Sequence, residues 1–170
     1  QKLRMALRIS KANPTLAQQK AEEAVNHEVG VMTTNADNAE LTLASTNPFE
    51  IIMYEYNGGD SRVSADITSY MNGYNDPRRA AMFTESTFAD GGYGIRTGIN
   101  IPDGTIAHAY SNYNVKTDSK LIIMNSAESA FLRAEGALKG WNMGATAKEL
   151  YEQGIKLSFE QWGVQGADAY

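Results

Sequence analysis

Two helix-forming patterns joined by a short turn fill the last fifty residues, and they constrain the fold more than any other feature. In the first pattern, apolar residues recur at i, i+3, i+7, i+10 and i+14, which places them on one helix face. These residues are Met124, Ala127, Phe131, Ala134 and Leu138. Gly140 follows and is typical of the left-handed position that ends a helix. The spacing predicts an amphipathic helix that ends at Gly140.

The second pattern begins at Thr146, where a T-x-x-E sequence predicts a capping box with Glu149. Its predicted buried face consists of Ala147, Leu150, Tyr151, Gly154, Ile155, Ser158 and Trp162. Residues 119–165 are therefore expected to form a helical hairpin.

Residues 1–30 repeat this plan. Leu3, Ala6 and Leu7 share one helix face, and the segment KANP (11–14) interrupts the helix. Thr15 and Gln18 then predict a T-x-x-Q capping box for a second helix. In that helix Ala17, Ala21 and Ala24 have the spacing of Ala147, Tyr151 and Gly154, as in the second helix of a tetratricopeptide repeat. Coincidence between two Ala-rich amphipathic helices is the alternative.

The central region, residues 31–118, is rich in loop-forming residues: residues 54–114 hold seven of the nine Tyr and eight of the fifteen Gly. Residues 47–60 fit either a strand or a buried helix end. Ile67, Tyr70, Met71 and Tyr74 have helical spacing, and Asp76 before Pro77 is a helix-start signal. The Gly-rich run 90–104 predicts a loop. The fold class expected is mainly α, with tetratricopeptide-like hairpins and long irregular loops, as a single unit over 1–170.

Composition excludes several functions. The 170 residues include no Cys, which removes disulfides, a Cys nucleophile and Cys-based zinc sites. A net charge of -5 without a basic run argues against nucleic acid as a partner. The two histidines, His27 and His108, belong to no metalloprotease motif, and no phosphate-binding glycine loop occurs. We therefore expect no catalytic residues, no cofactor and no metal.

One segment, NADNAE (35–40), clusters oxygen ligands that suit Ca²⁺. It lacks the glycine and the spacing of an EF-hand, so an Asx-rich turn explains Asn35, Asp37 and Glu40 better.

Three segments resemble the SusD/RagB family of nutrient-binding outer-membrane lipoproteins. They are LRMALRIS (3–10) with AEEAV (21–25), then YNDPRRAAMF (74–83), and then MNSAESAFLRAEGALKGWNMGATAKELYEQGIKLSFEQWGV (124–164). Their order and separation match the family, and the last match is the most specific. Family members are much longer, so the resemblance implies a central to C-terminal fragment. The signal peptide and lipid-bearing Cys of the family would lie upstream, and the fragment is expected to expose apolar surface.

The resemblance also implies a non-enzymatic role at the cell surface. Such proteins capture oligosaccharides and deliver them to a TonB-dependent, SusC-like transporter in the outer membrane. Their helical repeats form a scaffold thought to face the transporter, and their irregular loops carry the glycan site. Contact with the membrane would come only through a lipid anchor outside these residues.

Residue chemistry in the central region is suited to sugar binding, because aromatic faces pack on the apolar faces of pyranose rings while amides and guanidinium groups bind hydroxyls. The candidate ligand-binding residues are Tyr54, Tyr56, Tyr74, Tyr93, Arg96, Tyr110, Asn112 and Tyr113. Taken singly, each Tyr is better explained as a half-buried packing residue, and the hypothesis is that at least two of the group contact ligand in the full-length protein.

Four other residues attract a sugar-binding interpretation but are better explained otherwise. Trp141 and Trp162 are expected to pack in the core, and Arg78 and Arg79 to pair with a nearby acid or to be solvated. Another function remains open: a helical-repeat scaffold that binds a protein or peptide and has no sugar site. The ligand itself is also undecided between a glycan and a peptide.

Overall fold

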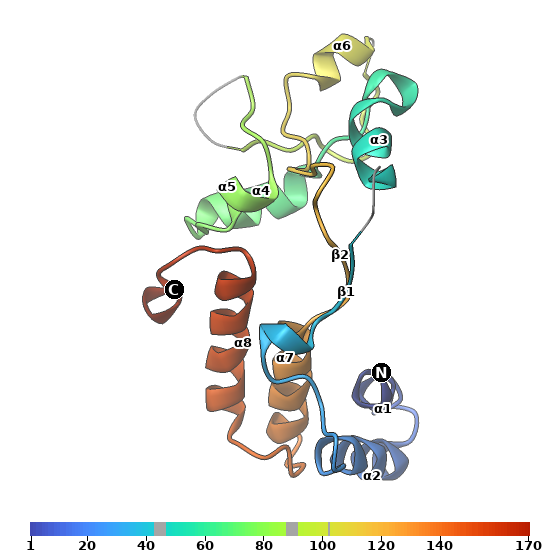
Figure 1. Cartoon of the computed structure of the whole chain (residues 1–170), viewed down its shortest axis with the longest axis vertical. Coiled ribbons are helices and arrows are strands. Elements are labelled where there is room, and N and C mark those ends of the chain that lie inside the picture. Colours follow the sequence, from blue (N-terminus) through green and yellow to red (C-terminus); the bar gives the residue numbers. More distant parts are fainter. Residues whose placement is uncertain (43–46, 88–91, 102) are drawn as a thin grey trace. The chain divides into compact units, whose positions relative to one another are not determined.

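The computed structural model describes residues 1–42, 47–87, 92–101 and 103–170. The chain divides into two compact units (Figure 1). Unit 1 comprises residues 1–40, 122–161 and 167–169, and unit 2 comprises residues 41–121, 162–166 and 170. Helices dominate unit 1 and are the main regular structure of unit 2, which confirms the predicted mainly α class.

Unit 1 contains the two predicted helical hairpins, but Met124, predicted on the helix face of the second, ends a strand that pairs with another segment. Helices α1 (Lys2–Arg8) and α2 (Pro14–Val25) form the first, and α7 (Ser126–Leu138) and α8 (Ala147–Gln161) form the second. Helix α7 packs along α8, as Figure 1 shows, and α1 contacts both α2 and α7. Their shared core includes Leu3, Ala21 and Leu150. No helix in the described ranges is long and apolar enough to cross a bilayer.

The ends of the second hairpin are as predicted. The amide of Thr146 donates to Glu149 Oε2 (2.9 Å), and the amide of Glu149 donates to Thr146 Oγ1 (3.3 Å). Gly140 has a φ of +81°, which confirms the left-handed stop after α7.

The start of α2 differs from the prediction. Asn13, not Thr15, caps this helix: its Oδ1 accepts from the amide of Leu16 (3.1 Å). Pro14 occupies the first helical position, where its missing N–H is no loss, and this fixes the helix start ahead of Thr15. The predicted partner Gln18 instead donates to Glu22 (2.9 Å).

Small residues allow close helix packing, as predicted. Ala17 and Ala21 are fully buried and Ala24 is 7% exposed. Gly154 faces the ring of Phe131, where a Cβ atom would lie only 2.6 Å from Cε1.

Two residues of the predicted apolar faces are exposed instead. Tyr151 is 57% exposed because the ring of Phe131 occupies the space beside Gly154, leaving Tyr151 at the edge with its ring 5.6 Å away. Leu138 is 79% exposed at the last turn of α7, where the chain already bends toward Gly140. The buried face of α8 is instead formed by Leu150, Gly154, Leu157 and Phe159. Trp141 is buried as predicted, while Trp162 is half-buried and lies after α8.

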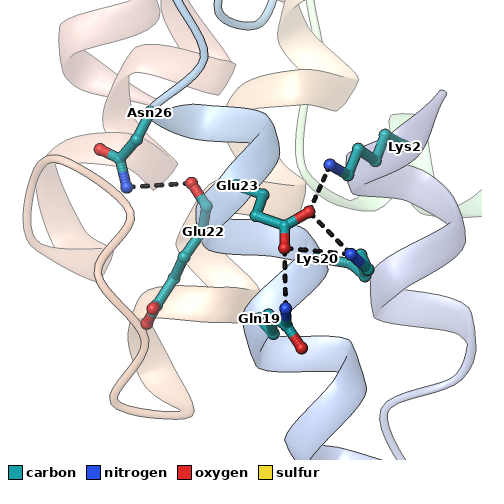
Figure 2. Close-up of polar contacts among 6 residues, drawn as sticks. All are labelled: Lys2, Gln19, Lys20, Glu22, Glu23 and Asn26. Carbon is teal, nitrogen blue, oxygen red and sulfur yellow. Dashed lines mark hydrogen bonds and ion pairs between the residues drawn. The ribbon is translucent and has the colours of Figure 1, made fainter.

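A cluster of charges joins the two helices of the first hairpin (Figure 2). Glu23 accepts from Lys2 Nζ (2.6 Å) and, within α2, from Lys20 Nζ (2.9 Å) and Gln19 Nε2 (2.9 Å). These bonds, led by the one from Lys2, lower the pKa of the Glu23 carboxyl to about 2. Glu23 therefore remains charged over the whole physiological range.

Strands β1 (Ala39–Leu41) and β2 (Leu121–Met124) pair into a two-stranded sheet. Before β1, the 3₁₀ helix η1 (Asn35–Asp37) forms within the NADNAE segment. The side-chain Nδ2 of Asn35 donates to the carbonyl of Leu157 (3.0 Å), and the carboxylate of Asp37 accepts from the backbone amide of Thr34 (2.9 Å). These side chains therefore hold a turn, and in the described residues no group of His, Asp or Glu side chains is arranged for a metal ion. Another 3₁₀ helix, η3 (Ala167–Ala169), follows α8.

Unit 2 consists of short helices and irregular segments. Its elements are α3 (Pro48–Tyr54), the 3₁₀ helix η2 (Tyr56–Gly58), α4 (Ala65–Gly73), α5 (Arg79–Met82) and α6 (Gly104–Ala107). For residues 47–60 the sequence allowed a strand or a helix end, and the structure has a helix followed by a 3₁₀ turn. Residues 92–101 and 103 belong to no helix or extended strand, in agreement with the predicted loop; residues 90, 91 and 102 of that prediction lie outside the described residues.

Helix α4 is present as predicted, but it buries a different face. Thr68 and Met71 are buried, whereas Ile67, Tyr70 and Tyr74 are exposed by 46%, 69% and 68%. The reason is polar: the hydroxyl of Thr68 accepts from the amide of Gly94 (2.8 Å), so the helix turns this residue toward the 92–95 segment.

Candidate functional site

Irregular segments of unit 2 are connected by backbone hydrogen bonds, and they carry several of the predicted ligand-binding residues. The amide of Val63 donates to the carbonyl of Ser111 (3.1 Å), and the amide of Ile95 donates to Val63 (2.7 Å). The amide of Ser111 donates to the carbonyl of Tyr93 (2.9 Å). Residues 62–65, 92–95 and 109–114 therefore form one frame, which we call the loop frame.

The segments of the loop frame approach very closely at Gly94. A Cβ atom at this position would lie 2.3 Å from the carbonyl oxygen of Ser64. Only glycine allows this approach, because real side chains do not tolerate contact with backbone at that distance. Val63, next to Ser64, is completely buried.

Asn112 fixes helix α3 to the loop frame. Its Nδ2 donates to the carbonyl of Met53 (2.9 Å), and its Oδ1 accepts from the amide of Tyr113 (2.8 Å). The residue is 6% exposed. The Asn112 side chain is thus occupied by protein partners, and we assign it a positioning role rather than contact with ligand.

Tyr93 and Tyr113 lie in the loop frame, Tyr54 at the end of α3 is bonded to it, and all three are partly exposed. Tyr54, Tyr93 and Tyr113 are exposed by 41%, 44% and 38%. The hydroxyl of Tyr54 donates to the backbone carbonyl of Tyr113, and burial raises the pKa of that phenol. The ring of Tyr113 packs edge-on against Phe83, with centroids 5.7 Å apart. Anchored aromatic rings that remain half-exposed are suited to stacking on a flat apolar ligand face.

The other four predicted residues do not belong to this group of three tyrosines. Tyr110 is half-buried in the 109–114 segment, and Arg96 is exposed one residue beyond the frame. Tyr56 lies in η2 and Tyr74 ends α4, with exposures of 64% and 68%. In the described part of the chain no hydrogen bond joins Tyr56 or Tyr74 to another predicted residue.

Sequence reasoning missed the residues that hold the frame. Ser111 is completely buried, and its Oγ accepts from the amide of Tyr93 (2.9 Å). Thr68 and Phe83 are likewise buried beside predicted residues. Their partners lie 18 to 30 positions away in the sequence. No short-range pattern identifies such distant partners. The only local signal is that Thr68 and Met71 are three residues apart and so share one side of α4.

The predicted pairing of Arg78 is confirmed. Its guanidinium binds the carboxylate of Asp76, which is 7% exposed and also accepts from the hydroxyl of Tyr170 (3.1 Å). The ring of Tyr170 lies 5.3 Å from the guanidinium carbon. Burial alone would raise the pKa of Asp76, but the hydrogen bonds from Arg78 lower it overall. Among the residues that the structure describes, no acid pairs with Arg79, which donates to Asn72 Oδ1 (2.6 Å).

Unit 1 contains a cavity of about 280 Å³ that none of the predicted residues lines. It lies among α1, α2 and α7, with apolar walls that include Leu3 and Leu132. Its charged groups are paired with one another, Lys2 with Glu23 and Arg4 with Glu128. We therefore place the candidate site on the tyrosines of unit 2, where rings and polar groups face solvent.

The comparison with family models gives one match, to the SusD-like family described as Susd and RagB outer membrane lipoprotein, over residues 1–170. Among proteins with curated functions, none is similar enough to match.

Solved structures with this fold are also similar in sequence. A chitin-binding SusD homologue from Flavobacterium johnsoniae is 46% identical, with a TM-score of 0.92 over 99% of this chain and 35% of its own. A SusD homologue from Bacteroides thetaiotaomicron is 44% identical, with a TM-score of 0.92 over 99% of this chain and 36% of its own. A third, from Bacteroides uniformis, is 46% identical, with a TM-score of 0.90 and the same two coverages. The chain spans about a third of the length of these structures and belongs to the SusD/RagB family of outer membrane lipoproteins.

Proposed function

We propose that this chain contributes a glycan-binding surface to a non-catalytic, cell-surface lipoprotein that delivers oligosaccharides to a TonB-dependent, SusC-like transporter. Family membership supports the outer-membrane setting. The chitin-binding relative from Flavobacterium johnsoniae, 46% identical to this chain, supports a carbohydrate ligand. The observation that carries the proposal is the set of three half-exposed rings, Tyr54, Tyr93 and Tyr113, held by one frame of backbone and side-chain bonds.

These rings suit binding without bond chemistry. A ring fixed in place stacks on a sugar face without losing much conformational freedom, and neighbouring amides and hydroxyls bind the sugar hydroxyls. Each ring that a sugar covers contributes through the apolar area that it removes from water, about 25 cal/mol per Å². Release to a transporter requires moderate affinity, and a few rings on an open surface provide that.

Chitin oligosaccharides are the first ligand to test, because a relative of high similarity is chitin-binding. Calorimetric titration with chitohexaose compares the chain with its Tyr93→Ala variant. We expect affinity to fall about three- to tenfold, the loss of one stacking ring. Tyr151→Ala is the matched control, because Tyr151 is also an exposed tyrosine (57%, against 44% for Tyr93) but belongs to unit 1. Equal affinity of Tyr93→Ala and Tyr151→Ala would contradict the assignment of the site to unit 2.

The choice of ligand class is tested in the same experiment. Xylo- and malto-oligosaccharides and a mixed peptide pool are titrated beside chitohexaose. Binding of peptides alone would favour the peptide-binding repeat scaffold over the glycan-binding protein.

The proposed delivery step is tested with the longer protein and its transporter. Co-purification of the two from outer membranes, and its loss when the α7–α8 hairpin carries charge-reversing changes, would support contact through the helical repeats. Retention of the complex by every unit 1 variant would argue against that surface.

A further inference from the structure

A side-chain relay in unit 2 ends at the residue before Tyr93. Arg79 Nη1 donates to Asn72 Oδ1 (2.6 Å), and Asn72 Nδ2 donates to the carbonyl of Gly92 (2.9 Å). The Asn72 amide uses its acceptor end for Arg79 and its donor end for Gly92. The relay therefore has a fixed direction, from the guanidinium through the amide to the loop backbone.

The stem of Arg79 also packs directly on Gly92. A Cβ atom on Gly92 would lie 3.3 Å from Arg79 Cδ and 3.4 Å from Ser111 Oγ. Gly92 is buried between these two side chains. Arg79 thus acts on the same loop residue twice, once by packing and once through Asn72.

Side chains hold the backbone at three successive positions around Tyr93. The carbonyl of Gly92 is held by Asn72, the amide of Tyr93 by Ser111 Oγ (2.9 Å) and the amide of Gly94 by Thr68 Oγ1 (2.8 Å). Thr68 and Asn72 are four residues apart on α4, so they share one helix face. Helix α4 is a template on which this part of the loop is fixed.

The backbone turn before α5 holds Arg79 in place. The amide of Arg79 donates to the carbonyl of Asp76 (3.2 Å), and the buried carboxylate of Asp76 pairs with Arg78. The DPRR sequence at 76–79 therefore has two separate roles: Asp76 and Arg78 close the turn, and Arg79 reaches the loop.

We propose that Arg79 and Asn72 are positioning residues for Tyr93, whose ring is 44% exposed while its backbone is fixed on both sides. They set the affinity for ligand without touching it, because a ring held in its bound orientation loses less freedom on binding. This inference rests on the proposed sugar-binding role of unit 2 for its functional part, and on the backbone contacts alone for its structural part.

The variant Asn72→Asp tests the relay selectively. The carboxylate still accepts from Arg79, but it has no hydrogen to donate to the carbonyl of Gly92. Residue-resolved hydrogen exchange by NMR is expected to show the amides of Tyr93 and Gly94 exchanging about tenfold faster or more, in the manner of a local opening. Chitohexaose affinity is expected to fall about threefold or more, because the freed ring pays an ordering cost on binding.

A second variant and a control separate positioning from general stability. Arg79→Lys keeps the packing stem and one cationic donor, so it should protect the Tyr93 and Gly94 amides better than Asn72→Asp does. Asn26→Asp removes an equivalent bond, from Nδ2 to the carbonyl of Glu22 (2.9 Å), but in unit 1 (Figure 2). It should change neither the two amides nor the sugar affinity.

The outcomes distinguish this inference from the proposed function. Unchanged exchange at Tyr93 and Gly94 in a folded Asn72→Asp chain would overturn the positioning role, whether or not the chain binds sugar. Faster exchange with wild-type chitohexaose affinity would overturn the link between positioning and binding. If the unaltered chain binds no sugar, the proposed function fails, and the exchange measurement still decides the structural part. Should Asn72→Asp not fold, Arg79→Met decides the positioning role, because it keeps an apolar stem against Gly92 but has no donor for Asn72: exchange at Tyr93 and Gly94 should again be faster, and exchange as in the unaltered chain would overturn the role.

Discussion

Gly154 of α8 lies against the ring of Phe131 in α7, where a Cβ atom would come within 2.6 Å of Phe131 Cε1. Gly154→Ala should therefore destabilise unit 1 by about 1–3 kcal/mol through overpacking. That exceeds the gain of about 1 kcal/mol that alanine brings to a helix interior. The free energy of unfolding from urea denaturation measures the balance.

Gly73 supplies the control for this change. It ends α4 with nothing within 4 Å of its added Cβ atom and with an ordinary φ. Gly73→Ala should be neutral or stabilising by up to about 1 kcal/mol. A Gly154→Ala chain as stable as the unaltered one would contradict the tight helix contact.

Gly94→Ala should disrupt the loop frame, because the new methyl group would lie 2.3 Å from the backbone oxygen of Ser64. Backbone cannot move aside as a flexible side chain does, so the pairing of residues 63–65 with Ile95 should open. We expect loss of chitohexaose binding and NMR shift changes throughout unit 2, with the resonances of α7 and α8 unchanged. Wild-type spectra for residues 62–65 would show that the close approach does not exist.

The charge cluster at Glu23 should give unit 1 a distinct acid dependence. The folded pKa of Glu23 is about 2, below the ordinary value of 4.5, so its contribution is present above pH 4.5 and is lost as pH falls toward 2. Glu23→Gln should lower stability at neutral pH, and the gap to the unaltered chain should close between about pH 4.5 and 2. Thermal unfolding of both chains, measured across this pH range, gives the size of the gap.

Glu28→Gln is the control for the acid series, because Glu28 is an exposed carboxylate of the same unit. It removes one negative charge without removing the contact to Lys2. A gap for Glu23→Gln that persists unchanged at pH 2 would mean that the cluster does not depend on the carboxylate charge.

Asp76→Asn should destabilise unit 2 by about 2 kcal/mol, because the half-buried guanidinium of Arg78 loses its charged hydrogen-bond partner. The new amide keeps the size of Asp76 and can still accept from the amide of Arg78, which sits 2.9 Å away. The loss of stability should appear as earlier denaturation of unit 2, which the NMR signals of α4 monitor. A change below about 0.5 kcal/mol would place this pair among the weak surface ion pairs.

The sequence was informative where the relevant interactions are local. The Thr146–Glu149 box, the Gly140 stop and the Ala17–Ala21 stripe each depend on residues within four positions, and all are confirmed. The start of α2 was misplaced because two capping patterns overlap, and Pro14 decides between them.

Burial was harder to predict than helix formation. Periodicity identifies a helix face but not the neighbour that covers it, so Tyr151 and Leu138 were placed inside although both are exposed. For the candidate site, residue type indicated the tyrosines, but the frame that holds them depends on contacts between distant segments. Thr68 and Ser111 reach the 92–95 segment from 26 and 18 positions away, which no local pattern encodes.

The way α4 holds the 92–94 backbone has an evolutionary consequence. Its contacts end on main-chain atoms, the carbonyl of Gly92 and the amide of Gly94, and not on the side chain at position 93. Selection can therefore exchange the outward side chain at position 93 while the course of the loop is preserved. Under the proposed sugar-binding role, a point mutation at position 93 would alter which polysaccharide is recognised, without rebuilding the fold.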